Sequence, residues 1–373
     1  MKTLAPYQIF FPIGILCALL AVGVWFTQNL GWFDTPVMWV HGKLIAGGFL
    51  WSFIVGFLMT AVPRMTGTFN AHKVEYAISF LLILALIVFS WALDAKPFYF
   101  ISFALTVFIM IYAGRRLVVS TRPVPVFFSH VGLAMFMSLV GSYFYYRGQS
   151  ILGFYFYHVG TILLLVLGIG TRFFAFLSGL PSVFEGTEEK WKKAAFHMMG
   201  LAIVVLLSVV GMRLSWGFLG LALLTLGYLF CIWQVQRSSS RPSALKWAVR
   251  IVAVMIPLSF ILSWIYPVYY LSWMHILFVG CFGLITFSVA TRVTLAHGAY
   301  PTDMELKSKA LGWMVAFIVL AMVSRVFYGF SSGLWKTSFL HLAGTFWFLA
   351  VGVWCYSYFK KIFKLGPQSK PSC

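Results

Sequence analysis

The sequence predicts an all-α, polytopic membrane protein of about twelve helical spans, and three observations carry that prediction. Of the 373 residues, 61% are hydrophobic and only 9% are charged, which leaves too little polar surface for a water-soluble fold. The apolar residues come in long uninterrupted runs, and a helix needs about 20 such residues to cross roughly 30 Å of hydrocarbon. The basic residues lie in short clusters between those runs, which is typical of membrane topology rather than of a nucleic-acid-binding surface.

The apolar runs and the breaks between them place the spans in a single transmembrane domain, residues 1–373. The breaks carry helix-ending residues, as in the segments 94–97 and 238–242. The first run follows Lys2 and has no clear small-residue cleavage site after it, so it is interpreted as a span rather than a removed signal. The predicted spans are 8–29, 38–62, 74–93, 97–117, 125–146, 151–177, 194–212, 216–235, 246–266, 270–295, 309–329 and 337–358.

The basic residues also orient the chain in the membrane. With the N-terminus inside, all but six of the 27 Lys and Arg residues fall in cytoplasmic segments. This bias predicts that both termini are cytoplasmic and that the number of spans is even. The acidic residues all fall in loops or at span ends, whereas cation-coupled transporters usually need a carboxylate at mid-membrane. The six outer basic residues are Lys43, Lys96, Arg147, Arg213, Arg325 and Lys336.

Four of the eight histidines are predicted to gather near the outer face of the membrane. His41, His158 and His275 fall in the outer turns of the second, sixth and tenth spans. They are separated by equal intervals of 117 residues, so these spans are candidates for equivalent places in three four-helix units. His341 falls in the outer part of the twelfth span. Neutral imidazole is a good ligand for iron, copper or zinc, and we expect at least two of the four to be ligands. For each one, a hydrogen bond to a neighbouring helix is the alternative.

A b-type haem is the leading cofactor predicted for these histidines. Histidine is the usual axial ligand of haem, and 39 Phe, 15 Trp and 17 Tyr offer an aromatic lining. Outer cations would pair with the haem propionates. Arg325 is the residue assigned to that role, from the candidates Arg147, Arg213, Arg325 and Lys336. The competing interpretation is that the cations anchor span ends and that the aromatic residues form interface belts.

Other polar residues near the outer face are assigned ordinary roles. Lys43, two residues after His41, is expected to snorkel outward to the membrane surface. Five tyrosines are expected to lie in the interface rather than to deliver protons: Tyr143, Tyr145, Tyr146, Tyr155 and Tyr157. The five cysteines have no spacing that indicates a disulfide framework, a zinc site or c-type haem attachment.

Two segments resemble hallmarks of the NnrS family of membrane proteins. GFLMTAVP at 56–63, followed by Thr66 and Gly67, is similar to the end of that family's second helix. TRVTLAHG at 291–298 is similar to the end of its tenth. With weaker similarities at Pro6, at Phe10 and Phe11 and at 170–174, the resemblance runs to about residue 301. It implies a haem- and copper-containing protein of the bacterial inner membrane, connected with nitric oxide and nitrosative stress.

The resemblance also implies roles for individual residues. His41 matches the first histidine of the family's second-helix motif, and His275 and His297 fall where its tenth-helix histidines lie. The family often has a further histidine and then an acid where this chain has Lys43 and Leu44.

A more distant resemblance is to the twelve-helix layout of haem–copper oxidases and nitric oxide reductases. Helix seven here has only His197, at its inner end, instead of the paired outer histidines that hold copper in those enzymes. Helix ten lacks their His-x-His pattern. If copper is bound, His158 and His341 are the residues assigned to it.

The sequence therefore predicts that His41 and His275 hold a haem, with His158 or His341 as a candidate for a further ligand. This haem is expected to bind nitric oxide and to detoxify or reduce it. A nitric oxide reductase-like oxidoreductase, a non-catalytic sensor or sink, and a transporter of a small solute or metal are left open. No electron-donor motif or acidic proton channel is recognisable in the sequence to choose between them. The lipid bilayer and nitric oxide are the expected partners, and nucleic acid is not.

Overall fold

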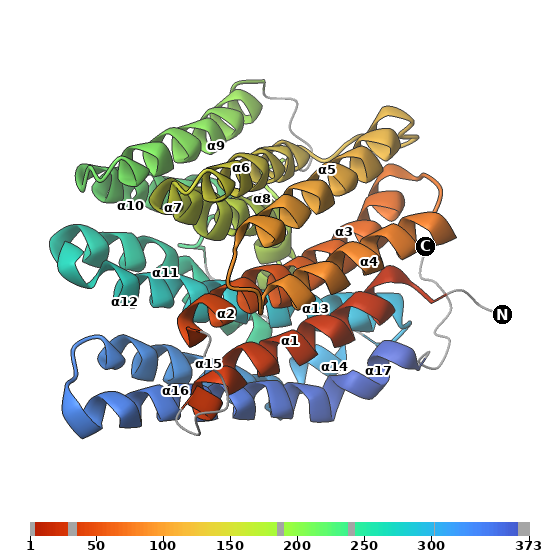
Figure 1. Ribbon diagram of the computed structural model, residues 1–373. Helices are drawn as coiled ribbons and strands as arrows, with labels where there is room; N and C mark the ends of the chain where they lie inside the picture. The colour runs from red at the N-terminus through yellow and green to blue at the C-terminus, as the bar shows by residue number, and fades with distance from the viewer. Residues whose placement is uncertain (1–3, 29–35, 185–189, 238–242, 302, 365–373) are drawn as a thin grey trace.

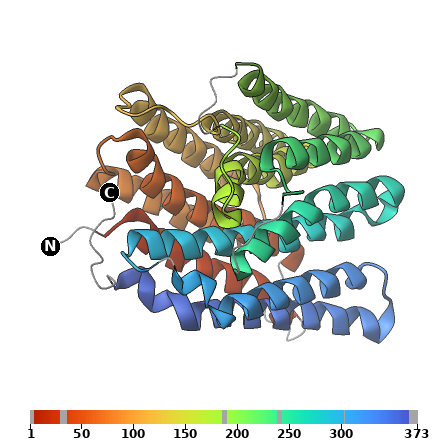
Figure 2. The same cartoon turned by 180° about the vertical axis from the view of Figure 1, so that it is seen from behind.

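Each regular element that the structure describes is a helix, which confirms the predicted all-α class. The computed structural model describes residues 4–28, 36–184, 190–237, 243–301 and 303–364. Figure 1 and the view from behind in Figure 2 place α15 (Lys309–Tyr328) and α16 (Gly333–Trp354) along one edge of the bundle. Both views place α9 (Lys190–Gly211) along the opposite edge.

The helices follow the predicted spans, and several change pitch along their length. The remaining elements are α1 (Pro6–Gln28), α2 (Val37–Lys43), η1 (Leu44–Leu50), α3 (Trp51–Thr66), α4 (Lys73–Phe89), α5 (Lys96–Val118), α6 (Phe128–Tyr146), α7 (Ser150–Gly153), η2 (Phe154–Gly160), α8 (Thr161–Ser178), α10 (Trp216–Tyr228), η3 (Leu229–Trp233), α11 (Ala244–Ile265), η4 (Pro267–Tyr269), α12 (Tyr270–His275), η5 (Ile276–Gly283), α13 (Leu284–His297), α14 (Asp303–Leu306), η6 (Cys355–Phe359) and α17 (Lys360–Phe363).

Ten of the continuous helical segments are long and apolar enough to cross a membrane. The helices α4, with 17 residues, and α6, with 19, pack beside α5, and counting them with the ten gives approximately the predicted number of spans. Near the start of α1, Gln8 Nε2 donates to the carbonyl oxygen of Ile362 in α17 at 2.7 Å. The first and last spans therefore meet at one face of the bundle, which requires an even number of crossings.

Three helical segments form the centre of the bundle, and we call them the central helices: Val37–Thr66, Ser150–Ser178 and Pro267–His297. In their apolar stretches, 83%, 78% and 72% of the residues are buried, against 33% to 50% in the other seven candidate spans. They correspond to the second, sixth and tenth predicted spans. Because protein rather than lipid surrounds them, they can carry polar side chains that lipid would not tolerate.

The central helices share two local features that agree with three related units. Each contains a π-helical turn in its outer half, at η1, η2 and η5, and such turns are rare and frequent at functional sites. A residue with left-handed backbone also follows the last turn of each within two residues, at φ 66°, 67° and 56°. After that residue, a backbone N–H reaches back to a carbonyl of the last helical turn. The left-handed residues are Gly67, Gly179 and Ala299.

The equal spacing of the three histidines in the sequence does not mean that they occupy equivalent positions in the three central helices. His41, His158 and His275 lie 26, 21 and 24 residues before the left-handed residues that end their helices. If the three histidines occupied equivalent positions in three related units, these distances would be the same. At 1.5 Å per residue, the histidines are spread over about 7 Å of depth, so they line one region from three levels.

Candidate functional site

A cavity of about 1270 Å³ lies between the N-terminal halves of the three central helices, which the distribution of basic residues predicts to be their outer halves. We call it the outer cavity. Ligand sites for drug-sized molecules measure roughly 300–1,000 Å³, so this one has room for a large cofactor. Much of its wall is aromatic or aliphatic, including Phe49, Phe154, Phe278 and Trp347. Its titratable lining residues are His41, Lys43, Asp94, Tyr99, Tyr145, Tyr155, His158, Arg213, Tyr270, His275, Arg325 and Tyr328.

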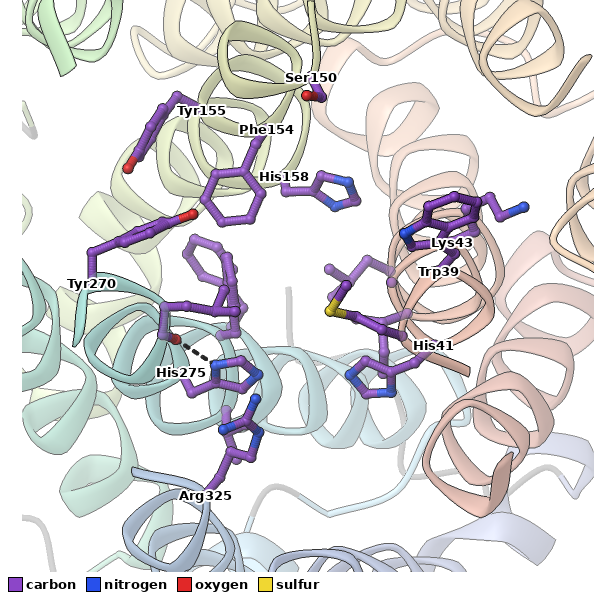
Figure 3. Close-up of a pocket in the computed structure, with 18 of the residues that line it drawn as sticks. Trp39, His41, Lys43, Ser150, Phe154, Tyr155, His158, Tyr270, His275 and Arg325 are labelled. Carbon is purple, nitrogen blue, oxygen red and sulfur yellow. Dashed lines mark hydrogen bonds between the residues drawn. The ribbon is translucent and has the colours of Figure 1, made fainter. Parts of the chain in front are cut away.

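His41 enters the outer cavity from the end of α2, just before the π turn η1 (Figure 3). Its Nδ1 lies 2.7 Å from the carbonyl oxygen of Ala21 in α1. A carbonyl oxygen can only accept, so Nδ1 carries the proton and Nε2 keeps a lone pair. The ring is braced by Trp25, which meets it edge-on with 5.7 Å between ring centroids.

His275 repeats this arrangement on the opposite wall. It is the last residue of α12, and its Nδ1 donates to the carbonyl oxygen of Leu271 at 2.6 Å. Nε2 is again the nitrogen with the free lone pair. In Figure 3 the rings of His41 and His275 project into the cavity from facing sides. Metal-ligating histidines commonly donate their second ring nitrogen to a backbone carbonyl in this way.

His158 lies within the π turn η2 and lines the same cavity. Its ring is surrounded by the rings of Tyr145, Phe154 and Tyr157, with centroids 5.6, 5.8 and 5.1 Å away. Within the described part of the chain, neither ring nitrogen of His158 has a hydrogen-bond partner. Ring contacts alone hold this imidazole at the cavity wall.

His341 is not brought into the outer cavity. It belongs to α16, whose neighbouring residues Leu340, Ala343 and Gly344 line the cavity instead. The imidazole packs against Phe26 of α1, with 5.1 Å between ring centroids. The structure therefore brings together three of the four histidines that the sequence grouped.

Glycines at the π turns let neighbouring helices approach closely. A Cβ atom on Gly160 would collide with Met137, and one on Gly280 would collide with Met322. A Cβ atom on Gly47 would lie 2.6 Å from the ring of Phe98. In the sequence, these three glycines follow His41, His158 and His275 by six, two and five residues. Their role is to let flanking side chains pack against the widened turns that carry the imidazoles.

Two arginines also line the outer cavity. Arg325 comes from α15, lies near His275 in Figure 3, and has its guanidinium 4.6 Å from the ring centre of Tyr328. Arg213 comes from the turn between α9 and α10, where its own backbone is left-handed at φ 65°. The other two outer cations, Arg147 and Lys336, are not among the lining residues.

Lys43 is buried, so the expectation that it snorkels outward is wrong. Its exposed fraction is 4%, and its Nζ donates to the carbonyl oxygen of Ala92 at 2.7 Å and, more weakly, to that of Phe89 at 3.5 Å. These carbonyls belong to the C-terminal end of α4 and its following turn, where helix carbonyls lack partners and attract cations. Lys43 thus joins a central helix to α4 at the edge of the cavity.

The tyrosines divide into an exposed and a buried group. Tyr143 and Tyr146 are exposed, as an interface position requires, but Tyr155 and Tyr157 are buried and the interface prediction is wrong for them. Burial of Tyr157 is possible because its hydroxyl is within 2.9 Å of Ser102 Oγ. Tyr145 lines the cavity and stacks on Tyr99 at 4.1 Å between ring centroids.

Sequence reasoning missed four titratable lining residues: Asp94, Tyr99, Tyr270 and Tyr328. All four lie near outer helix ends or in an outer turn, at the depth that the topology gives to His41 and His275. Extending the depth argument from histidine to every polar residue of the outer turns would have found them.

Among the described residues, no three His, Cys, Asp or Glu side chains are placed to hold one metal ion. His158 and His341, the residues assigned to copper, do not share the outer cavity. Two facing imidazoles suit a haem better, because the porphyrin brings its own equatorial nitrogens and needs only axial ligands from the protein.

The motif segments lie at the inner ends of the central helices, away from the outer cavity. Trp354 Nε1 donates to Thr291 Oγ1 at 2.8 Å, and Arg292 pairs with Glu305 at 3.3 Å. At the other motif, the backbone N–H of Tyr7 donates to Thr60 Oγ1 at 3.2 Å. His297 packs at 5.8 Å from the ring of Tyr7, so it is not brought together with His275.

Comparison with known proteins gives one family. The family model described as NnrS protein matches residues 3–364, nearly the whole chain. That range includes both motifs and all the residues of the outer cavity. No curated protein matches the chain.

Proposed function

We propose that this protein, which belongs to the NnrS family over residues 3–364, binds a b-type haem in the outer cavity and nitric oxide at that haem. Membership of the family suggests a role in the nitric oxide response. The observation that carries the haem proposal is the pair of imidazoles on facing walls. His41 and His275 each commit Nδ1 to a carbonyl oxygen and keep Nε2 for a ligand.

The surroundings of the pair support a haem rather than a lone metal ion. The cavity of about 1270 Å³ is walled by rings such as Phe154, Phe278 and Trp347, which suit a flat apolar macrocycle. Arg325 is proposed to pair with a propionate, since guanidinium binds carboxylate through charge-assisted hydrogen bonds. His158 is proposed to face the same cofactor from the third central helix. Copper has no part in this proposal.

Each group of residues that lines the outer cavity is proposed to have a separate role. A haem held by His41 and His275 would supply an iron that binds nitric oxide. His41 and His275 hold the cofactor with neutral lone pairs, and the aromatic walls exclude water. For the finer proposal of reduction, the phenols of Tyr155 and Tyr270 are the proton donors at the cavity wall.

The membrane setting fits a dissolved gas as the ligand. The chain is a polytopic membrane protein, and we propose the bacterial inner membrane as its location. A small apolar molecule such as nitric oxide reaches a buried cavity through lipid and apolar packing, without a charged pathway.

An absorption spectrum tests the proposal. Protein purified from cells supplied with ample haem is expected to show a Soret band that shifts when nitric oxide is added. Consumption of nitric oxide with a supplied reductant would identify an oxidoreductase, whereas a shift without consumption would identify a sink or sensor. Protein without a Soret band would contradict the proposal and favour the transporter alternative.

A further inference from the structure

A second, smaller void lies between the same three central helices, closer to the cytoplasmic face. Its volume is about 80 Å³, and we call it the axial crevice. Leu50, the last residue of η1, lines both the axial crevice and the outer cavity. The lining residues are Phe11, Leu50, Phe53, Ile54, Phe57, Leu58, Ile162, Leu165, Val166, Ile169, Gly170, Phe173, Ile285, Thr286 and Val289.

The position of the crevice follows from the order of residues along the central helices. On each helix, the crevice residues come after the cavity residues, as Phe53 comes after His41 and Ile285 after His275. Twelve residues of helix from His41 to Phe53 correspond to about 18 Å along the axis. The crevice therefore lies further along the helix axes than the outer cavity. It is open at one side, since several of its lining residues, such as Phe57, Phe173 and Val289, are only half-buried.

The crevice is apolar. Among its lining residues, only Thr286 carries a side-chain polar atom, and its hydroxyl already donates to the carbonyl oxygen of Phe282 at 2.7 Å. A buried water needs about two to four polar partners, and a void needs only about 10–15 Å³ to hold one. The crevice is large enough for water and offers it almost nothing to bind, so it should stay dry.

Stiff walls keep the void from collapsing. Phe53 stacks on Phe11 with 4.6 Å between ring centroids and meets Phe49 at 5.3 Å. On the opposite helix, a Cβ atom on Gly170 would collide with Trp233, so α8 is already pressed against its neighbour. Interiors are usually close-packed, and an open void with rigid aromatic walls can admit a small apolar guest.

We propose that the axial crevice binds a small apolar gas molecule and passes it to the outer cavity by way of Leu50. The identification of that gas as nitric oxide rests on the proposed function. The existence of the gas site does not, because it follows from the volume, apolarity and rigidity of the crevice. Phe49 and Phe53, in contact with one another, extend the connection from the crevice wall to the cavity wall.

A structure of the detergent-purified protein under xenon tests the site directly. Xenon is expected between Phe53 and Leu165. A crevice that stays empty, holds ordered water, or holds a lipid or detergent chain would overturn the proposal. Since this measurement uses the unaltered chain and no haem, it stands whether or not the haem proposal survives.

A filling variant and its matched control sharpen the result. Leu165→Phe places a larger side chain in the crevice and should abolish the xenon site. Leu223→Phe makes the same change at an exposed position of α10 and should leave the xenon site as it is. Xenon retained in Leu165→Phe, or lost in Leu223→Phe, would contradict the assignment.

In haem-loaded protein, the crevice should also hold nitric oxide that has left the iron after a light flash. Leu165→Phe is then expected to lose the slower phase of nitric oxide rebinding, while Leu223→Phe keeps it. A Soret band together with an empty crevice under xenon would overturn the crevice alone. A xenon-filled crevice without a Soret band would overturn the haem alone.

Discussion

The outer cavity and the surroundings of Arg116, at the inner side of the bundle, treat buried polar groups in opposite ways. At the inner side, Arg116 of α5 is fully buried and all five of its N–H groups are used. They donate to both carboxylate oxygens of Glu75 and to the carbonyl oxygens of Phe69, Asn70 and Tyr112, at 2.8 to 3.2 Å. We call this set the inner clamp.

In the outer cavity, by contrast, His41 and His275 each leave Nε2 uncommitted toward a large open volume. Satisfied polar groups hold helices together, whereas uncommitted ones in a cavity are available to a ligand. The two regions should therefore respond differently to substitution. Changes in the inner clamp should lower the stability of the fold, whereas changes in the outer cavity should lower the affinity for the cofactor.

The largest expected effect is on the inner clamp. Arg116→Met should destabilise the protein by about 3–5 kcal/mol, because it leaves the carboxylate of Glu75 without its partner. A thermal melt in detergent at a fixed scan rate measures the loss. Arg115→Met, which changes the exposed neighbour, is the control and should melt like the parent protein. Equal melting of both variants would show that the clamp is not a stabilising element.

A smaller effect is expected when the cavity cation is removed. Arg325→Met should weaken haem binding about tenfold, or about 1.4 kcal/mol, through loss of one charge-assisted contact. Titrating haem into cofactor-depleted protein measures the affinity. Lys336→Met removes an outer cation that does not line the cavity and should leave affinity unchanged. If Arg325→Met lowers the melting temperature and leaves the haem affinity unchanged, Arg325 stabilises the fold and does not bind the cofactor.

A pair of hydroxyl deletions compares the two regions at the level of a single hydrogen bond. In the inner region, Tyr112 donates its hydroxyl to the carbonyl oxygen of Met59 at 2.9 Å. Tyr112→Phe should therefore cost about 1 kcal/mol. Tyr270→Phe, at the outer cavity, should leave the melting temperature unchanged. A larger loss of thermal stability in Tyr270→Phe than in Tyr112→Phe would contradict the expected difference between the two regions.

The smallest effect is expected at the fourth outer histidine. His341→Ala should leave haem content unchanged, because this imidazole packs on Phe26 outside the lining of the outer cavity. The ratio of haem to protein after purification measures it. A large loss of haem would mean that the twelfth span contributes a ligand after all.

The sequence could predict what depends on membrane depth. Apolar runs and basic clusters gave the order of the helices, and depth alone placed His41, His158 and His275 at one side. The direction in which a helix faces is a different quantity, because it depends on how helices pack in lipid. His341 has the right depth on a helix that turns this residue toward α1, and no pattern in a single sequence reveals that.

Contacts between distant segments were equally out of reach. Lys43 is buried because the end of α4 presents the carbonyl oxygen of Ala92 to it, and Arg116 finds Glu75 across 41 residues. The recognisable motifs at 56–63 and 291–298 turned out to form inner helix ends. Patterned sequence there reflects helix termini and interhelical bonds, while the cavity is assembled from residues scattered over many helices.

The central claim is that His41 and His275 hold a haem in the outer cavity, and absorption spectra of matched variants test it most directly. The parent protein and His72→Ala, which changes an exposed histidine at the start of α4, should both show a Soret band at equal haem content. His41→Ala and His275→Ala should each lose the band while remaining folded, with a single cooperative thermal melt. A Soret band retained in both outer variants would contradict the account and move the haem away from this cavity.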